Sequence, residues 1–319
     1  MYALGDGVPQ SNKLAIEWYL KAAAQENAYS QGQLGDIYYF GRGVSQDFNL
    51  AAVWFKKAAA QGDEYSETQL GNLYHDGSGV PQDYKQSFHW YMKAAKQGQA
   101  SAQYYIAKAY VKGEGVVKND KLSIEWLGKS ATQGNSDAQC GLGDMYRHGR
   151  GVVKDYKLAA EWYIKSAFQG NPICQSSIGA MYSEGLGVAQ DYKLASMWFK
   201  KSAAQGDELG QYNLAQLYRE GKGVPQDYNQ AFDWYKKSAA GGYASAQTAL
   251  GGMYYSGLGV KKDMIRAHMW INLGAANGDE KALKVRNTNS NFTEMTQSQI
   301  SQAQKMASEC EKRSYKNCD

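Results

Sequence analysis

The chain has 319 residues, of which 43% are hydrophobic and 21% charged, and it contains only four prolines. This composition is typical of a folded chain and excludes a disordered one. The net charge of +4 is too small to indicate a nucleic acid or an anionic membrane as partner, and the sequence contains no apolar run of about 18 residues that would span a bilayer.

A strict internal repeat organises the chain. Its eight tryptophans are separated by intervals of 36 residues throughout: Trp18, Trp54, Trp90, Trp126, Trp162, Trp198, Trp234 and Trp270. A Gly-x-Gly-Val sequence keeps the same period from Gly5 to Val260, and a tyrosine precedes each copy, from Tyr2 to Tyr254. Because no insertion interrupts the period, we expect one elongated array of stacked repeats in place of the two globular domains that the length would suggest.

The first repeat begins in mid-register. Met1-Tyr2 takes the place that Ile37-Tyr38 and Leu73-Tyr74 hold in later copies, at the end of a helix. We therefore expect the first repeat to lack most of its first helix, and we expect any signal peptide to lie upstream of this sequence.

Residues 135–170 show what one repeat contains. Asn135 is a good N-cap for a first helix, helix A, as are Asp63, Asn171 and Asp207 in their own copies. Ala138, Leu142, Met145 and Tyr146 follow the helical period and predict one buried stripe. Gly143 lies beside that stripe, and glycine or alanine recurs there in the other copies: Gly35, Gly71, Ala107, Gly179, Ala215 and Gly251. Since glycine weakens a helix, its recurrence predicts a close contact between helices.

A second helix, helix B, completes each repeat. Gly149 and Gly151 are expected to end helix A, since glycine adopts left-handed backbone geometry without strain. Asp155 is the expected N-cap of helix B, as are its counterparts Asp47, Asp83, Asp191, Asp227 and Asp263. Along helix B, Leu158, Ala159, Trp162 and Tyr163 fall on one face. We expect burial of the tryptophan to be the largest stabilising contribution of each repeat.

The pattern ends after Asp279. Asn287 to Asn291 reads as a loop, and a last helix is expected from about Thr293 to Arg313, with Ile300, Ala303, Ala307 and Cys310 on one face. We interpret this helix as a C-terminal cap over the open end of the array. The expected organisation is therefore a repeat array over residues 1–286, followed by a loop, a capping helix and a cysteine-containing tail over residues 287–319.

The repeats resemble Sel1-like repeats, which are relatives of the tetratricopeptide repeat. The resemblance rests on Ala-x-x-x-Leu-Gly-x-x-Tyr-x-x-Gly-x-Gly-Val, then Asp, then Ala-x-x-Trp-x-x-Lys-Ala-Ala-x-Gln-Gly, which is nearly complete in residues 66–98 and 138–170. It implies an all-α fold, a right-handed α-solenoid of 36-residue helical hairpins. It also implies an adaptor for protein complexes, of the kind found in the bacterial periplasm, in host interaction and in quality control in the endoplasmic reticulum.

In tetratricopeptide relatives, the face of helix A opposite the buried stripe lines a concave groove. The corresponding positions vary from copy to copy here, whereas the stripe does not, so we expect them to bind a protein or peptide partner. The residues singled out for this role are Tyr29, Tyr39, Phe40, Tyr65, Asn72, His75, Tyr104, Lys108, Asp144, Arg147, Tyr212, Arg219 and Tyr255. The alternative is that these tyrosines only cover neighbouring helices.

A row of lysines also keeps the period, from Lys21 to Lys237. Such a ridge could follow a phosphate backbone. However, Glu17, Glu125, Glu161 and Asp233 each precede a row lysine by four residues, and we expect ordinary surface ion pairs. No nucleic-acid partner is therefore predicted. The four histidines have no ligand spacing, so no metal and no cofactor is expected.

Signatures of catalysis are weak. Gly-x-Gly-Val lacks the third glycine and the strand of a dinucleotide-binding loop. Some cysteine-rich Sel1-like relatives have been described as weak β-lactamases, but no serine here has a lysine three residues on, so the usual nucleophile motif is missing. We expect a non-catalytic, monomeric interaction scaffold. The alternative is an enzyme or small-molecule binder for β-lactam or cell-wall material that uses the same groove.

The four cysteines bear on the compartment. Cys140 falls on the predicted groove, and Cys174 replaces a small helix A residue and is expected to be a buried thiol. Cys310 and Cys318 resemble the paired terminal cysteines of exported Sel1-like proteins. A bridge between them would hold the cap and imply a periplasmic or secreted protein, whereas two free thiols would suit the cytoplasm.

Overall fold

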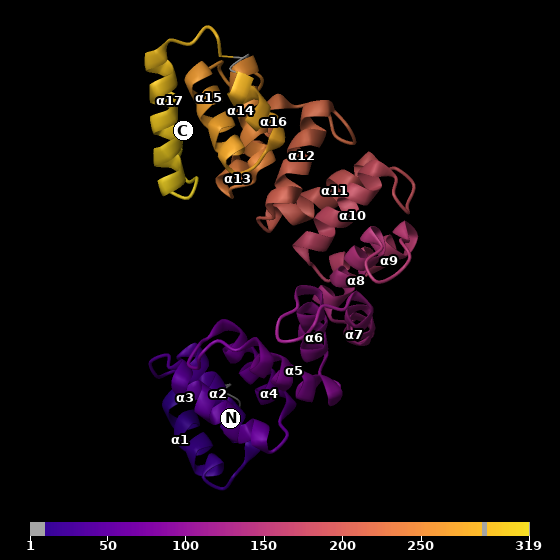
Figure 1. Ribbon diagram of the computed structural model, residues 1–319, viewed down its shortest axis with the longest axis vertical. Coiled ribbons are helices and arrows are strands. Elements are labelled where there is room, and N and C mark those ends of the chain that lie inside the picture. Colours follow the sequence, from indigo (N-terminus) through magenta and orange to yellow (C-terminus); the bar gives the residue numbers. More distant parts are fainter. Residues whose placement is uncertain (1–9, 289–291, 319) are drawn as a thin grey trace. The chain divides into compact units, whose positions relative to one another are not determined.

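The computed structural model describes residues 10–288 and 292–318, which form 17 helices and no strand. The chain divides into two compact units, unit 1 (residues 1–154) and unit 2 (residues 155–319). In Figure 1 the helices of each unit follow one another as stacked pairs. The turn expected at Gly5 to Val8, and Tyr2 before it, lie outside the described residues.

The described part of unit 1, residues 10–154, holds eight helices. Those of helix B type are α1 (Asn12–Ala23), α3 (Phe48–Ala60), α5 (Tyr84–Lys96) and α7 (Asp120–Thr132). Those of helix A type are α2 (Ala28–Phe40), α4 (Glu64–Asp76), α6 (Ala100–Lys112) and α8 (Ser136–His148). Each helix packs against the next along the chain, which confirms the predicted series of helical hairpins.

Unit 2 continues the alternation and adds the cap. Its helices are α9 (Tyr156–Phe168), α10 (Pro172–Glu184), α11 (Tyr192–Ala204), α12 (Glu208–Glu220), α13 (Tyr228–Ala240), α14 (Ala244–Ser256), α15 (Met264–Ala276), α16 (Glu280–Thr288) and α17 (Gln297–Lys312). The fold is therefore an α-solenoid. In the part of the chain that the structure describes, no helix has both the length and the apolar character needed to cross a bilayer.

Side-chain caps set the helix starts, as the sequence predicts. Asp63 and Asn135 each accept a hydrogen bond from the backbone N–H three residues on, and Asp155 does the same at α9. At the other end of helix A, Gly149 and Gly151 have φ of 66° and 70°, in the left-handed region that favours glycine. Helix and turn boundaries thus follow from local chemistry.

The predicted close contact between the two helices of a hairpin is confirmed. A Cβ built on Gly35 would lie 2.5 Å from the Phe55 ring, and one on Gly179 would lie 2.7 Å from the Phe199 ring. At Gly71 the ring of Tyr91 occupies the same space. The missing side chain on helix A therefore makes room for the residue that follows the tryptophan on helix B.

The expectation that the tryptophans form the buried spine is wrong for most of them. Trp18 is 57% exposed, and only Trp198 and Trp270 are buried. The fully buried ring is the next residue, as at Phe55 and Tyr235. One residue of helix turns the side chain by about 100°, so the tryptophan covers the edge of the hairpin while its neighbour fills the interior.

The lysine row explains the exposed tryptophans. In each of the first seven repeats the lysine ammonium lies 3.9–4.7 Å from the centroid of the tryptophan ring three residues before it, as in the Trp54 and Lys57 pair. These are cation–π contacts. The expected ion pairs with acidic residues four positions earlier do not form among the described residues. Trp270 has Leu273 in place of the lysine, and there the cap buries the ring.

A buried glutamine joins consecutive repeats. Gln103 donates to the carbonyl of Ala95, at the end of the preceding helix B, and accepts from the amide of Gln133, at the end of its own helix B. The donor bond recurs at Gln31, Gln139, Gln175, Gln211 and Gln247. We call this series the glutamine ladder. It gives helix-end carbonyls a second hydrogen bond, in addition to the one that each accepts from a backbone N–H of the following turn, as Ala95 does from Gly98.

One position of the ladder carries a carboxylate. Glu67 is 1% exposed, accepts from Gln97 at 2.8 Å, and lies 3.1 Å from the ammonium of Lys93. The same ammonium lies over the ring of Trp90. A charge this deeply buried needs such a partner.

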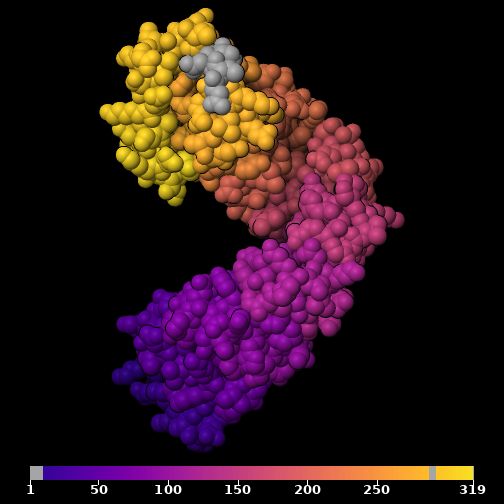
Figure 2. Space-filling view, viewed as in Figure 1, coloured from indigo at the N-terminus to yellow at the C-terminus, as the bar shows by residue number. Residues whose placement is uncertain are grey.

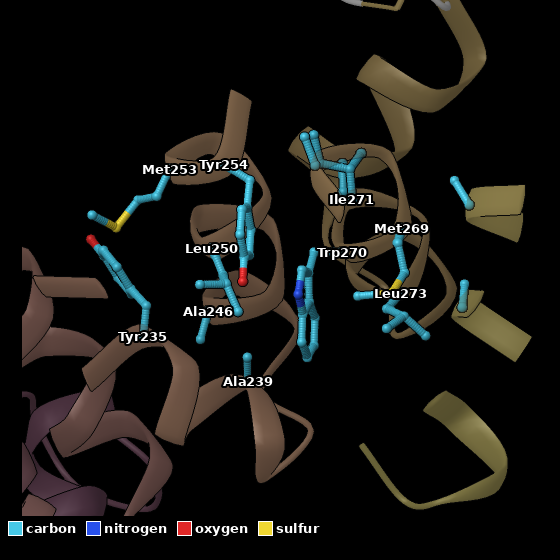
Figure 3. Close-up of a cluster of buried hydrophobic side chains, with 14 of the residues drawn as sticks. Tyr235, Ala239, Ala246, Leu250, Met253, Tyr254, Met269, Trp270, Ile271 and Leu273 are labelled. Atoms are coloured by element: carbon cyan, nitrogen blue, oxygen red, sulfur yellow. The ribbon is translucent and has the colours of Figure 1, made fainter. Parts of the chain in front are cut away.

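The last helices close unit 2. Trp270 lies beside Leu250 and Tyr254 of α14 in the core, with Leu273 on its other side (Figure 3). Ala303, Ala307 and Cys310 of α17 are buried in the same cluster, and Ile300 packs against it. The predicted capping helix is confirmed, and it forms an outer surface of the unit (Figure 2). The predicted loop begins later than Asn287, because α16 continues to Thr288; residues 289–291 lie outside the described chain.

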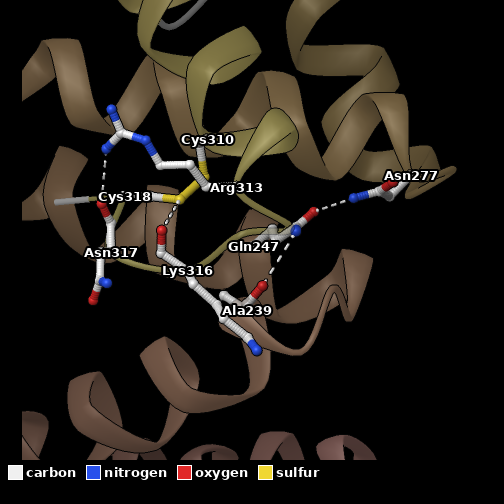
Figure 4. Close-up of a disulfide and its surroundings, with 8 residues drawn as sticks. All are labelled: Ala239, Gln247, Asn277, Cys310, Arg313, Lys316, Asn317 and Cys318. Atoms are coloured by element: carbon white, nitrogen blue, oxygen red, sulfur yellow. Dashed lines mark hydrogen bonds between the residues drawn. A yellow bond between two sulfur atoms is a disulfide. The ribbon is translucent and has the colours of Figure 1, made fainter.

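A disulfide joins Cys310 at the end of α17 to Cys318 in the tail (Figure 4). The loop that it closes places the hydroxyl of Tyr315 3.0 Å from Asn277, beside the last bonded pair of the ladder. Cys140 and Cys174 are also disulfide-bonded. Cys174 is buried as expected, but the expectation of a free thiol there is wrong.

Two neighbouring residues test which ring holds a hairpin together. We expect Phe55→Ala to cost about 3–5 kcal/mol, because it empties a fully buried site. Trp54→Ala should cost only about 1–2 kcal/mol, because it removes a half-exposed ring and a surface cation–π contact. Urea unfolding followed by circular dichroism compares the two, and a larger loss in Trp54→Ala would contradict this packing.

The glutamine ladder predicts a cost for losing one amide. Gln103→Leu should destabilise the protein by about 1–3 kcal/mol, because two buried hydrogen bonds are lost, one to the Ala95 carbonyl and one from the Gln133 amide. Gln25→Leu, at an exposed glutamine after α1, is the matched control and should change stability by less than about 0.5 kcal/mol. Equal urea midpoints for the two variants would show that the ladder contributes no stability.

Candidate functional site

A cavity of about 290 Å³ opens on the helix A side of unit 1. Tyr39 of α2 contributes to it, together with residues of α4, α5 and α6 and of the turn that follows α6. Its lining is Tyr39, Asn72, His75, Asp76, Tyr84, Ser87, Phe88, Tyr91, Tyr105, Lys108, Ala109 and Glu114. Five of the twelve lining residues are tyrosine or phenylalanine, and five others carry charged, imidazole or amide groups: Asn72, His75, Asp76, Lys108 and Glu114.

The contact at Gly71 positions the floor of this cavity. Because α4 has no side chain there, the Tyr91 ring of α5 lies against it. The Tyr91 hydroxyl then donates to Asn72 Oδ1 at 2.7 Å, and its ring stacks on Tyr105 of α6 with centroids 4.8 Å apart. Burial raises the pKa values of both phenols, so the two hydroxyls stay protonated and serve as hydrogen-bond donors.

His75 connects the charged groups at the rim. Its Nδ1 lies 2.7 Å from Asp76 Oδ1, and its Nε2 lies 3.3 Å from Glu114 Oε2. The ring also meets Tyr84 edge to face at 5.4 Å. Glu114 Oε1 lies 3.3 Å from the ammonium of Lys112. The imidazole is thus held between two carboxylates that come from different repeats.

The structure brings four of the residues singled out from the sequence into this cavity: Tyr39, Asn72, His75 and Lys108. Three others lie on the helix A side of unit 1 as exposed aromatic rings. Tyr29 is 65% exposed, Phe40 51% and Tyr65 38%. The Tyr65 hydroxyl donates to Asp36 at 2.8 Å, and the guanidinium of Arg42 lies over the Phe40 ring.

The remaining expected site residues lie elsewhere. Tyr104 is half-buried beside Tyr105, and Asp144 and Arg147 are half-buried on α8. In unit 2, Tyr212 and Arg219 both bond to Gln216, and Tyr255 lies near the cap, with its ring 6.1 Å from that of Phe292. None of these lines the cavity of unit 1.

One helix A position that the prediction places in the open groove is buried. The groove prediction includes the helix A position that Gly32, Thr68, Cys140 and Ser176 occupy, and all four are buried; Thr68 and Ser176 are 4% and 1% exposed. Neighbouring helices A touch there: a Cβ built on Gly32 would lie 3.0 Å from the hydroxyl of Ser66. Packing between repeats therefore uses a position that the helical period assigns to the open face.

Sequence reasoning also missed half of the cavity. Tyr84, Phe88 and Tyr91 come from helix B, which the groove prediction left out. The sequence feature that indicates Tyr91 is the aromatic residue that follows most tryptophans. Glu114 stands between two turn glycines, where the equivalent residues in other repeats are Ser78 and Arg150; this variation is the sequence feature that sets the position apart.

The same place three repeats later provides an internal comparison. A cavity of about 120 Å³ in unit 2 is lined by the equivalents of these residues, among them Phe199, Asn213, Gln216 and Lys222. Gln216 is engaged by Tyr212 and Arg219, and Lys222 lies 2.8 Å from Glu220. The larger opening in unit 1 is thus a property of that repeat's own side chains.

These features define an α-solenoid built from 36-residue helical hairpins. The Sel1 repeat family matches residues 1–27, 28–63, 65–99, 100–135, 136–171, 172–207, 209–243 and 244–279. The chain belongs to the Sel1 repeat family. Members of this family are in general protein-interaction scaffolds and not enzymes.

Two solved structures illustrate the relationship. A protective antigen of uropathogenic Escherichia coli with an SLR fold is 33% identical, with a TM-score of 0.62 over 99% of this chain and 76% of the other. A Sel1 repeat protein from Oxalobacter formigenes is 34% identical, with a TM-score of 0.67 over 86% of this chain and 80% of the other. A sequence search of curated proteins gives no match.

The buried phenols predict sensitivity to alkali. The pKa of Tyr91 is raised by burial, so the folded state keeps a proton that the unfolded chain releases near pH 10. The stability from this group is complete below about pH 10 and falls as the pH rises further. Tyr91→Phe should therefore flatten the decline between pH 9.5 and 11, measured by urea unfolding at each pH, and an unchanged slope would contradict the assignment.

Proposed function

We propose that the protein is a non-catalytic, monomeric scaffold that binds a protein or peptide partner through the helix A face of unit 1. By this face we mean the cavity together with the exposed rings of Tyr29, Phe40 and Tyr65. One observation carries the proposal: an open cavity with unused polar groups is lined in part by α2 and α4, which also carry the exposed aromatic side chains, and the Tyr39 ring of its wall contacts the ring of Phe40. Aromatic anchors next to a pocket are the usual centre of a protein interface.

The general role of the family supports this reading. The rest of the chain is consistent with it, because the ladder, caps and turns repeat whereas the residues of this face do not. The rigid repeats hold the face in place, which lowers the entropy lost on binding.

Site-specific photocrosslinking tests the proposal. The photoreactive amino acid p-benzoylphenylalanine is placed at Phe40 or Tyr65 on the proposed face, and at Val53 on helix α3 as a matched control. Val53 is 47% exposed, so all three positions reach solvent. We expect a discrete crosslinked partner from Phe40 and Tyr65, and none from Val53, in the cells from which the gene comes.

Two results of the crosslinking experiment would contradict the proposal. Crosslinking from Val53 that equals crosslinking from the helix A positions would show non-specific contact. A partner captured only from unit 2, for example with the probe at Ile173, which is 60% exposed, would move the binding site out of unit 1. Circular dichroism of each variant confirms that the fold is kept.

We also propose that the protein works outside the cytoplasm, in the periplasm or as a secreted protein. The support is that all four cysteines are disulfide-bonded, which is usual in oxidising compartments.

Alkylation tests this assignment. Protein isolated from its native compartment and denatured without reductant should add no iodoacetamide, and after reduction it should add four groups per chain by intact mass. Alkylation of the unreduced chain as isolated would indicate a reducing compartment.

A further inference from the structure

Each charged group around the unit 1 cavity lies within contact distance of a polar or charged partner, with one exception. Asp76 and Glu114 both face His75, and Glu114 also pairs with Lys112. Lys108 lines the same cavity, is half-buried, and makes no ion pair, hydrogen bond or cation–π contact within the described chain. Its ammonium offers three donors and a full charge to whatever enters the cavity.

The neighbouring polar groups are also donors. The hydroxyls of Tyr39 and Tyr105 have no hydrogen-bond partner among the described residues, although both rings line the cavity. The amide of Asn72 is already used by Tyr91 and Gln69. Among the unused groups of the wall are therefore an ammonium and two phenol hydroxyls, and a ligand that matches these three supplies acceptor oxygens and a negative charge.

In the equivalent cavity of unit 2, the side chain in place of Lys108 is bonded to its neighbours. Gln216 stands there in place of Lys108, and both ends of its amide are bonded to neighbours. Lys222, in place of Glu114, is paired with Glu220. That cavity has less than half the volume of the one in unit 1. Side chains at these positions can therefore bond to neighbouring side chains in this fold, but Lys108 makes no such bond.

We infer that the unit 1 cavity is a carboxylate-binding subsite, in which the ammonium of Lys108 and the hydroxyls of Tyr39 and Tyr105 hold a carboxylate of the partner protein. This inference rests on the proposed function and names the chemistry of its contact. The carboxylate comes from an acidic side chain or from a chain end, and the aromatic walls cover the carbon atoms that carry it.

Short peptides test the subsite on the full-length protein. The probes are acetyl-Gly-Glu-Gly-amide and acetyl-Gly-Gln-Gly-amide, which differ in one charge, and acetyl-Gly-Gly-Gly with either a free or an amidated C-terminus. Binding is followed by backbone amide shifts in 15N-labelled protein. We expect saturable shifts in α4, α5 and α6 with a carboxylate peptide and none with its amide partner. Comparing the glutamate peptide with the free C-terminus distinguishes the two sources.

Variants at one lysine complete the test. Lys108→Met should weaken carboxylate binding by about tenfold or more, the usual effect of removing one charge-assisted hydrogen bond. Lys108→Arg should restore most of it. Lys85→Met removes an exposed lysine of α5 outside the cavity and should leave the affinity unchanged, which controls for net charge.

Three results would overturn the inference: equal shifts from the glutamine peptide, an unchanged affinity in Lys108→Met, or no saturable shift from any carboxylate peptide. The proposed function fails differently. If carboxylate peptides bind at Lys108 but Phe40 and Tyr65 crosslink no partner, the subsite stands without the scaffold role. If the crosslinks form but no carboxylate binds, the scaffold role stands and the carboxylate assignment is wrong.

Discussion

The close approach of the two helices within each hairpin is the contact on which the rest of the structure depends. A residue without a side chain on helix A admits a ring or branched side chain from helix B, as at Gly35 with Phe55 and at Gly251 with Ile271. The same contact also builds the site. At Gly71 it brings Tyr91 far enough across to bond Asn72, and this places the aromatic floor under the cavity. The side chain that packs this hairpin is thus also the one that forms the floor of the cavity.

What the sequence could predict is local. The N-caps, the left-handed glycines and the boundaries of the repeat helices depend on residues within a few positions of one another, and they lie where the pattern places them. The last helix, which lies outside the pattern, begins at Gln297 and not near Thr293. The 36-residue period identified the solenoid because a repeated unit must stack in a repeated way. The capping helix followed from the loss of the pattern together with an apolar face that needed cover.

What failed was the assignment of faces. Periodicity shows that Trp54 recurs, but it does not show whether Trp54 or Phe55 points into the hairpin, and the larger ring was chosen on hydrophobicity alone. The ion-pair prediction for the lysine row uses only acidic residues four positions away. The partner of each lysine is instead the tryptophan three positions away, as in the Trp54 and Lys57 pair. The groove prediction identifies only part of the cavity lining, for a related reason. The cavity needs side chains from four helices and a turn, and the groove prediction followed one face of one helix.

The glutamine ladder sets a rule for how such a chain can change its length. At Gln103 the buried amide joins a carbonyl eight residues before it to an amide 30 residues after it, and Gln31, Gln175 and Gln247 do the same, so these neighbouring repeats are locked at a fixed separation along the chain. Loss of a single residue between two of these positions would leave a buried donor and a buried acceptor facing the wrong atoms. Loss or duplication of a whole repeat within a unit would leave the bonding pattern unchanged. The array is therefore modular in units of one hairpin, and the face that we propose for binding in unit 1 can be moved, copied or deleted with its hairpins, without redesign of the scaffold around it.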